Sequence, residues 1–472
     1  MNIGIQLDRQ DFLYDIHSLV KSFFPEDEVS VYTDADTDKC GIKRDLLFRV
    51  EIPSYEDRKA AKDALKRELY GTLSDLTGIR LPWGTLSGIR PTKIPMGMLE
   101  KGRSDEEIRA FLMENYFVTP EKCGLALQIA KTERELLKGI DLSEDSWSLY
   151  FPVPFCPSIC LYCTFSSSPY GAWKKRTGEY IATMLGEYRR FLEESGTGRP
   201  PSTIYIGGGT PTSLTAEELE RLLSGIEELT DTRAALEYTV EAGRPDSITP
   251  EKLRVLKAHG VTRISVNPQS MNPETLELIG RAHTPEDTVR AFYLAREAGF
   301  DNINMDIILG LPGEGAAEVS RTLDAVRELK PDSLTVHSLA VKRASRLRQT
   351  IREDREKDAG ADYGNFQGRI FENSREIMAL AADCAKDLGM EPYYLYRQKN
   401  MKGNLENTGF ARPGKACLYN ILIMEEVQAI RAFGAGGSTK TVSPDGRIER
   451  VISPKDVKTY LERQAQRTGT VS

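Results

Sequence analysis

The sequence predicts an α/β protein whose central part is built on parallel β-strands. From residue 148 onward, short apolar runs of strand length alternate with amphipathic helical runs. Strands separated by helices in this way pair in parallel through right-handed crossovers. Units of this length suit either a barrel or an open doubly wound sheet, and strand periodicity does not separate the two. The expected strands are 149–153, 203–206, 236–240, 263–266, 302–309 and 334–337.

Amphipathic helices are expected between these strands, because apolar residues recur there at helical spacing. The segment LTAEELERLLSGIEEL shows the pattern best: Thr215 is the expected N-cap, and Glu218 completes a capping box. Strands and helices together define a central domain over 146–345. The expected helices lie at about 174–195, 215–228, 250–258, 285–297 and 315–329.

Residues 1–145 are predicted to form a separate N-terminal α+β domain. Gly and Pro punctuate the segment LPWGTLSGIRPTK, which predicts a loop at 81–93. Strands are expected at 2–7, 28–33 and 46–52, and helices at 54–78, 104–115 and 119–139.

Residues 346–472 are predicted to form a mixed, mainly helical C-terminal domain. A long helix is expected over 365–389, and a further helix near 422–432. The segments AFGAGGSTK and GRIERVI predict a glycine-rich turn followed by a strand.

Composition limits the function classes. The chain has 472 residues, 40% hydrophobic and 28% charged, with a net charge of −7, which disfavours nucleic-acid binding. No run approaches the roughly 18 apolar residues that a transmembrane helix needs, so no stable membrane insertion is expected. The N-terminus lacks a secretory signal pattern. Seven cysteines in such a chain favour a reducing compartment, and we expect a cytoplasmic protein.

Three cysteines stand close together in FCPSICLYCTF, directly after the first expected barrel strand. Cys156, Cys160 and Cys163 have the spacing C-x3-C-x2-C. A zinc site needs a fourth ligand, and no other Cys or His is near in the sequence. A redox pair would use two of the three, and a buried structural trio does not suit a loop bracketed by prolines and serines. Three thiolates instead suit a [4Fe–4S] cluster with one iron left open for a chelating ligand such as an amino acid.

Polar or glycine residues follow the other strands at the ends where barrel chemistry gathers. Gly207–Gly209 in IYIGGGTPT allow close approach of the backbone to a ligand, although a tight turn would use them equally well. Glu241 follows the third strand, and Asn267 with Gln269 follows the fourth. Asp306 lies in the otherwise apolar fifth strand, where a carboxylate is costly unless it is paired or functional.

These features resemble radical S-adenosylmethionine (SAM) proteins of the oxygen-independent coproporphyrinogen III oxidase group over about residues 148–440. Within that group, WGTLSGIRPTK, YRQKNMKGNLENTGFA and YNILIMEE are similar to its coproporphyrinogen dehydrogenase branch. The resemblance implies a partial (β/α)6 barrel with the cluster at its open mouth. It also implies that the C-terminal domain completes a substrate cleft.

The resemblance further implies roles for individual residues. Cys156, Cys160 and Cys163 would bind three irons of the cluster. Tyr150 would lie against the methionine end of SAM, and Tyr162 near its adenine. The other SAM-binding residues that it implies are Gly208, Gly209, Thr210, Glu241, Gln269, Arg281, Asp306 and Ala340.

The implied activity is oxidative decarboxylation of a tetrapyrrole. A 5′-deoxyadenosyl radical would take a β-hydrogen from a propionate of coproporphyrinogen III, and loss of carbon dioxide and an electron would leave a vinyl group. Two rounds would give protoporphyrinogen IX. A flavodoxin- or ferredoxin-type donor for the cluster and an outside electron acceptor are also implied.

A substrate with four carboxylates calls for a local basic surface, because arginine binds carboxylates in a bidentate manner. The segments AVKRASRLRQTIR and YRQKNMKGN are the candidates, although a solvated surface is an equally good interpretation. Their basic residues are Lys342, Arg343, Arg346, Arg348, Arg352, Arg397, Lys399 and Lys402.

Two departures from the resembled oxidases leave alternatives open. Phe165 stands where they carry a further cysteine, as in the haem-carrier branch, and the N-terminal arm that holds a second SAM is not recognisable. A haem-binding chaperone is therefore one alternative, although Leu418 or Tyr419 stands where those carriers have histidine. Cys417 is a candidate substitute for that histidine as haem ligand. Another alternative is a radical enzyme that methylates or opens a tetrapyrrole.

Overall fold

The computed structural model describes residues 1–469 except 26, 34, 37–43, 53, 166, 343–344, 358–364, 367–368, 399–403 and 444. Its central strands all pair in parallel, which confirms the predicted α/β class. They begin and end within a few residues of the predicted bounds. These strands are β4 (Trp147–Val153), β7 (Thr203–Gly208), β8 (Glu237–Gly243), β9 (Arg263–Val266), β10 (Ile303–Leu309) and β11 (Ser333–Ser338).

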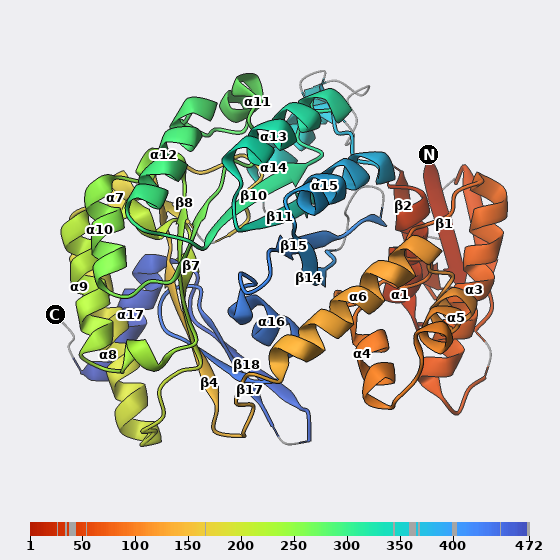
Figure 1. Ribbon diagram of the computed structural model, residues 1–472. Helices are drawn as coiled ribbons and strands as arrows, with labels where there is room; N and C mark the ends of the chain where they lie inside the picture. The colour runs from red at the N-terminus through yellow and green to blue at the C-terminus, as the bar shows by residue number, and fades with distance from the viewer. Residues whose placement is uncertain are drawn as a thin grey trace.

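The predicted helices of the central part also form, and Figure 1 shows them along the outer side of the curved sheet. The capping box is present: Glu218 N–H donates to Thr215 Oγ1 at 3.2 Å, and Thr215 N–H donates to Glu218 Oε2 at 2.9 Å. The helices are α8 (Thr177–Ser195), α9 (Ala216–Glu227), α10 (Pro250–Ala258), α12 (Pro285–Glu297) and α13 (Ala316–Leu329). Short helices α7 (Tyr170–Trp173) and α11 (Pro273–Leu278) were not predicted.

Side chains on the barrel strands alternate between an apolar and a polar environment, as the strand period of two requires. Residues such as Leu149, Ile204 and Val240 belong to the largest hydrophobic core, together with side chains from the outer helices. Residues of the alternate set are polar, and many of them are buried. They include Ser148, Thr203, Glu237, Thr239, Arg263, Ser265, Asn304, Ser333 and Thr335.

The C-terminal part continues the sheet at both edges, so the sheet reaches 11 strands in the order β14-β15-β11-β10-β9-β8-β7-β4-β16-β17-β18. Because β4 and β11 pair with these added strands and not with each other, the barrel is open, which gives it the partial form. This part therefore carries more strand than the sequence predicts. The added strands are β14 (Glu391–Tyr396), β15 (Asn407–Ala411), β16 (Ala429–Ala432), β17 (Ser438–Val442) and β18 (Ile448–Ile452).

Two predicted C-terminal helices are wrong in extent. The helix expected over 365–389 is α15 (Arg375–Asp387), which begins only after Ser374 caps Ile377 N–H. Residues before it form the short paired strands β12 (Asn365–Phe366) and β13 (Arg369–Ile370). Another helix, α14 (Arg346–Lys357), and the last, α17 (Val457–Thr468), were not predicted.

The helix expected at 422–432 is instead α16 (Leu418–Glu425), which lies in the hollow of the sheet (Figure 1). The buried Glu237 carboxylate sets its start, because it accepts the N–H groups of Leu418 at 2.8 Å and Tyr419 at 3.3 Å. The helix ends where Glu426 takes a left-handed conformation with φ of 56°. Residues 429–432 then form β16.

The N-terminal part has its own sheet, with the all-parallel order β2-β1-β3. Its strands β1 (Asn2–Leu7), β2 (Glu28–Thr33) and β3 (Leu46–Val50) agree with the predicted ranges. Helices α3 (Arg58–Thr77), α5 (Asp105–Tyr116) and α6 (Pro120–Leu137) were also predicted, whereas α1 (Leu13–Phe23) and α4 (Lys93–Glu100) were not.

A loop at 81–92 joins the N-terminal part to the C-terminal strands. Glu406 is 1% exposed and accepts hydrogen bonds from Trp83 Nε1 at 2.8 Å and Lys122 Nζ at 2.7 Å. Arg90 reaches the end of α16, where it pairs with Glu426 at 2.6 Å. Two of the sequence segments that mark the predicted branch, around 83–93 and 397–411, therefore contact each other.

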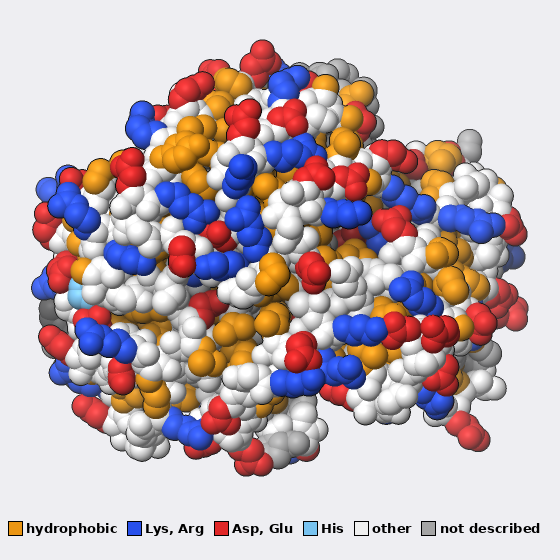
Figure 2. All heavy atoms as spheres, viewed as in Figure 1, with side chains coloured by type: hydrophobic (Ala, Val, Ile, Leu, Met, Phe, Trp, Pro, Cys, Tyr) orange, Lys and Arg blue, Asp and Glu red, His pale blue; other side chains and the backbone are white. Residues whose placement is uncertain are grey.

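The surface mixes charges of both signs, and hydrophobic side chains come to the surface around the hollow that holds α16 (Figures 1 and 2). No helix within the described residues is long and apolar enough to cross a bilayer.

We predict that Glu406→Ala lowers the free energy of unfolding by about 3 kcal/mol, because it leaves the Lys122 ammonium buried without its main partner. Denaturant unfolding followed by tryptophan fluorescence measures this change. Glu135→Ala is the matched control, since it removes the exposed Lys138–Glu135 pair and should leave unfolding unchanged. Equal unfolding of both variants would contradict the prediction.

Candidate functional site

Cys156 ends the short strand β5 (Phe155–Cys156), and Cys160 and Cys163 lie on the loop that leads from it to the parallel strand β6 (Ser168–Pro169). Cys156 and Cys160 are each 9% exposed, and Cys163 is half-buried. Backbone hydrogen bonds hold the loop: Leu161 N–H donates to Ile279 O at 2.9 Å, and Cys163 N–H donates to Cys160 O at 3.2 Å. The thiols are therefore gathered in one loop whose backbone is held in place.

Each sulfur has a different polar environment. Cys156 Sγ lies 3.5 Å from Thr210 Oγ1. Cys160 Sγ accepts from Arg244 Nη1 at 3.6 Å and lies 3.9 Å from Arg281 Nη1. Burial raises the pKa of the Cys156 thiol to about 11 and also raises that of Cys163. A positively charged iron–sulfur core is the kind of ligand that would offset this burial and hold the sulfurs as thiolates.

Within the described part of the chain, no three His, Cys, Asp or Glu side chains converge on a point that would hold a single metal ion. The cysteines are thus not placed as ligands of one zinc ion. Thiolates that each bind a separate iron of a cubane need no such convergence. None of the described cysteines, Cys160 and Cys163 included, forms a disulfide bond.

A glycine cradle lies beside the cysteine loop at the end of β7. A Cβ on Gly209 would lie 2.7 Å from Phe155 O and 3.0 Å from Cys156 Sγ, which no side chain can occupy without displacing the loop. Gly208 has a φ of 106°, which L-residues rarely adopt. A Cβ on Gly207 would likewise meet the Tyr205 ring and the Glu241 carboxylate, at 2.8 and 3.0 Å. The close approach explains why this segment needs glycine.

Glu241 lies next to this cradle at the end of β8. Tyr205 O–H donates to Glu241 Oε1 at 2.6 Å. Burial, and to a lesser degree the nearby Asp306 carboxylate, raise the pKa of Glu241 to about 7. A cationic ligand would therefore stabilise the ionised form of this buried carboxylate.

The ends of β9 and β10 are linked through Asn267 and Gln269. Asn267 Oδ1 accepts from Asp306 N–H at 3.1 Å, and Gln269 N–H donates to Asp306 O at 2.9 Å. Gln269 takes a left-handed φ of 66°, and its buried Oε1 has no hydrogen-bond donor within the described residues. A buried acceptor in strained backbone is the kind of group that a ligand satisfies.

Asp306 faces the polar side of the sheet, where neighbouring side chains contact its carboxylate. Asn304 Nδ2 donates to its Oδ1 at 2.7 Å, and His337 Nε2 lies 3.7 Å from its Oδ2. Burial acts to raise the pKa of Asp306, but His337 and Asn304 outweigh it and bring that pKa below its usual range. Asp306 is thus a charged group beside Glu241.

The remaining predicted residues lie around the same mouth. Arg281 donates to Asn267 O at 2.5 Å and to Tyr162 O–H at 3.4 Å, which ties the cysteine loop to the end of β9. Tyr150 is half-buried on β4 and stacks against Tyr419 with ring centroids 6.0 Å apart. Ala340 follows the end of β11 and is half-buried.

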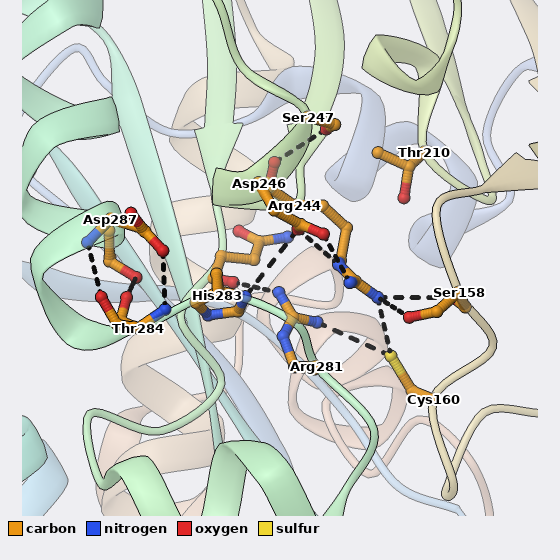
Figure 3. A network of polar contacts seen from close by, with 12 residues as sticks. Ser158, Cys160, Thr210, Arg244, Asp246, Ser247, Arg281, His283, Thr284 and Asp287 are labelled. Carbon is orange, nitrogen blue, oxygen red and sulfur yellow. Dashed lines mark hydrogen bonds and ion pairs between the residues drawn. The ribbon is translucent and has the colours of Figure 1, made fainter.

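Sequence reasoning missed several polar residues. Figure 3 shows Arg244, Asp246 and His283 between the cysteine loop and the start of α12. The signal for Arg244 and Asp246 was the segment AGRPD, in which an arginine and an aspartate follow the strand of Glu241. His337, at the end of the sixth predicted strand, was given no role, although it faces Asp306 and its Nδ1 lies 3.3 Å from Tyr396 O–H.

The predicted basic surface is only partly present. Arg397 is buried, 6% exposed, and donates to Asn404 and to the backbone oxygens of Leu86 and Leu405, so its assignment to a substrate surface is wrong. Lys342, Arg346 and Arg352 are exposed, and Arg348 is half-buried. The remaining predicted residues Arg343, Lys399 and Lys402 lie outside the described residues.

Cys417 is not placed to bind haem. It is 0% exposed and its thiol donates to Glu237 Oε1 at 3.2 Å. Burial, followed by the charge of Glu237, raises its pKa. A thiol that is held in this way has no free access to a haem iron.

The arrangement has the groups that a [4Fe–4S] cluster and SAM need. Three thiols are gathered in one loop, a glycine cradle lies against one of them, and two carboxylates with an unsatisfied amide oxygen surround the same strand ends. Such a donor set can hold an iron–sulfur cluster and a ligand with ammonium and hydroxyl groups.

Comparisons with known proteins agree with this geometry. The sequence model of the Radical SAM superfamily matches residues 150–326. The oxygen-independent coproporphyrinogen-III oxidase-like protein HemZ of Bacillus subtilis is 41% identical over 422 residues, which are 88% of this chain and 81% of that protein. An alignment of that length extends into the N-terminal part. The heme chaperone HemW of the same organism is 38% identical over 303 residues, 63% of this chain and 73% of HemW.

Among solved structures, the coproporphyrinogen III oxidase HemN of Escherichia coli, a radical SAM enzyme, has a similar fold. Its TM-score is 0.53 at 22% identity, over 71% of this chain and 73% of that one.

We predict that Gly209→Ala abolishes iron binding while the fold is kept, because the added Cβ displaces Cys156. Iron content after anaerobic reconstitution, with circular dichroism for folding, measures both effects. Gly171→Ala is the matched control, since a Cβ there meets no atom within 4 Å. Normal iron uptake by Gly209→Ala would show that the loop tolerates a side chain at this position.

Proposed function

Because the chain belongs to the Radical SAM superfamily, in the group of oxygen-independent coproporphyrinogen III oxidase-like proteins, we propose that it oxidatively decarboxylates coproporphyrinogen III. Two propionates would become vinyl groups, giving protoporphyrinogen IX for haem synthesis. The observation that carries the proposal is the cysteine loop packed against the Gly207–Gly209 cradle, at the strand ends where Glu241 and Asp306 lie.

The residues of the site have separate tasks in this proposal. Cys156, Cys160 and Cys163 hold a [4Fe–4S] cluster, which supplies the electron that cleaves SAM to a 5′-deoxyadenosyl radical. Glu241 binds the ammonium group of SAM, and Asp306 accepts hydrogen bonds from its polar groups. We assign the remaining SAM contacts to Tyr150, Tyr162, Gly208, Gly209, Thr210, Gln269, Arg281 and Ala340.

The substrate is proposed to lie at the open mouth of the barrel, next to the strand ends that carry Glu241 and Asp306. Among the predicted basic residues that the structure describes, Lys342, Arg346 and Arg352 are exposed, and we assign Lys342 and Arg346 to the carboxylates of the substrate. A flavodoxin- or ferredoxin-type donor would reduce the cluster, and a separate oxidant would take the electron left by each decarboxylation. We propose a cytoplasmic location, where such donors and reduced thiols are found.

The match to heme chaperones makes haem binding the second candidate function. Those proteins are similar over a smaller share of this chain. Here the buried bond of Cys417 to Glu237 removes the thiol that could replace a histidine ligand. The observations therefore favour the oxidase over the carrier.

The proposal is tested with anaerobically reconstituted protein, a reductant, SAM and coproporphyrinogen III. We expect about four irons per chain, release of 5′-deoxyadenosine, and two successive losses of carbon dioxide and two hydrogens by mass spectrometry. Cys160→Ala should lose all three, whereas Cys123→Ala, which removes a buried thiol of α6, should keep them. Zinc binding without SAM cleavage contradicts the proposal, and tight haem binding without turnover favours the carrier.

We also predict that SAM binding weakens as the pH falls through about 7. Glu241 has a raised pKa of about 7, so protonation below that pH removes the charge that attracts the ammonium group. At pH 6 about a tenth of the carboxylate is ionised. The affinity for SAM should then be about tenfold lower than with a fully ionised Glu241.

Equilibrium binding of SAM to the reconstituted protein between pH 5.5 and 7.5 measures this dependence. Glu241→Gln should bind more weakly and with no pH dependence in that range. The ammonium of SAM itself loses its proton only near pH 8. Identical pH profiles for the wild type and Glu241→Gln would remove Glu241 from this role.

A further inference from the structure

Arg244 is one of the polar residues of the site that have no task in the proposed reaction. It follows β8, is 3% exposed and is fixed by its own backbone, because Ser247 N–H and Ser247 O–H both donate to Arg244 O, at 2.9 and 2.7 Å. Burying a guanidinium is costly unless its donors are used. Its contacts therefore indicate what it is for.

Asp246 clamps one side of the guanidinium. Arg244 Nε donates to Asp246 Oδ1 and Nη2 donates to Oδ2, each at 2.8 Å, which is the bidentate geometry of a strong arginine–carboxylate pair. The remaining nitrogen, Nη1, then points toward the cysteine loop (Figure 3).

Nη1 makes three contacts on that loop. It donates to Ser158 O at 3.3 Å, to Ser158 Oγ at 3.1 Å and to Cys160 Sγ at 3.6 Å. Ser158 O–H in turn donates to Gly280 O at 3.0 Å, which joins the loop to the segment that carries Arg281. Arg244 thus holds the loop and directs a positive charge at one particular sulfur.

The neighbouring groups leave a net positive charge beside Cys160. Arg281 Nη1 is 3.9 Å from the same sulfur. His283 is buried with its Nδ1 3.9 Å from Asp246 Oδ1, and burial and the charge of Arg281 lower its pKa to about 4, so it is neutral at pH 7. Two guanidinium groups against one carboxylate therefore face this sulfur.

The other two sulfurs have no guanidinium hydrogen bond within the described residues. Cys156 has the Thr210 hydroxyl, at 3.5 Å. Cys163 has two neutral hydrogen-bonding groups beside it, the Phe165 N–H and the Ser167 side chain, and the Lys342 ammonium acts on it through its charge alone. The environment of the three ligands is therefore unequal.

We propose that Arg244, clamped by Asp246, is a positioning residue that holds the cysteine loop and sets the reduction potential of the cluster through Cys160. The inference rests on the proposed function, since it requires a cluster. Hydrogen bonds to ligand sulfurs and nearby positive charge both favour the reduced cluster, which carries one more electron. Arg244 thus makes the cluster easier to reduce than the buried thiolates alone would allow.

The test uses reconstituted full-length protein and an EPR-monitored redox titration of the cluster. Arg244→Gln should move the midpoint potential to more negative values, because a positive charge is lost. Asp246→Asn should move it in the opposite direction, because a negative charge is lost beside the retained arginine. Arg244→Lys, which keeps the charge but not the bidentate fork, should fall between the wild type and Arg244→Gln.

The opposite signs separate electrostatic tuning from a purely structural role, in which both substitutions would loosen the loop and act alike. Loop positioning is measured separately: iron retention against a chelator should fall about 10- to 100-fold in Arg244→Gln, the usual effect of losing a group that orients a ligand. Arg296→Gln is the matched control. Arg296 pairs with Asp332 at 2.6 Å and donates to two backbone oxygens, far from any ligand cysteine.

An unchanged potential in Arg244→Gln, or shifts of the same sign in Arg244→Gln and Asp246→Asn, would overturn the inference while leaving the proposed function intact. If Arg244→Gln does not fold, Arg244→Lys and Asp246→Asn decide the question by the same signs. Wild-type protein that takes up no [4Fe–4S] cluster would end the proposed function, and this inference with it.

Discussion

The polar face of the barrel sheet is the constraint on which the rest of this structure depends. Each strand turns one set of side chains toward the outer helices, where apolar packing stabilises the fold, and the other set toward the hollow. Buried polar groups need partners. They find them in one another, as where Arg263 Nη2 donates to Ser333 Oγ at 3.2 Å, and in the segments that fill the hollow.

Helix α16 is the clearest example of such a segment. Glu237 would be an unpaired buried carboxylate on the polar face, but it caps the start of α16 and accepts the Cys417 thiol. The stack of Tyr419 on Tyr205, with centroids 4.4 Å apart, brings the helix to the same strands that carry Glu241. The N-terminal part packs against C-terminal residues next to the hollow, where Trp83 binds Glu406 and Arg90 binds Glu426 at the end of α16. These contacts support the hollow from outside.

What the sequence could predict follows from how local each feature is. The capping box at Thr215, the strand bounds and the cysteine spacing depend on neighbours in the chain, and the structure has them as expected. The start of α16 depends on Glu237, about 180 residues earlier, and no local pattern contains that bond. Arg397 is the opposite case. The sequence predicted a surface cation at this position, but tertiary contacts with Asn404 and Leu405 bury the side chain.

The site itself is polarised, and this explains why its two proposed ligands bind side by side. Arg244 and Arg281 place positive charge near Cys160, where a cluster with three thiolates carries negative charge. Glu241 and Asp306 lie at the other strand ends, close enough for Asp306 to raise the pKa of Glu241. Two carboxylates held together in this way repel each other until a cation lies between them. SAM has both an ammonium and a sulfonium, so its binding relieves the repulsion on one side while the arginines stabilise the cluster on the other. The acidic balance of the whole chain is therefore no guide to this site, because the local charges have opposite signs at its two ends.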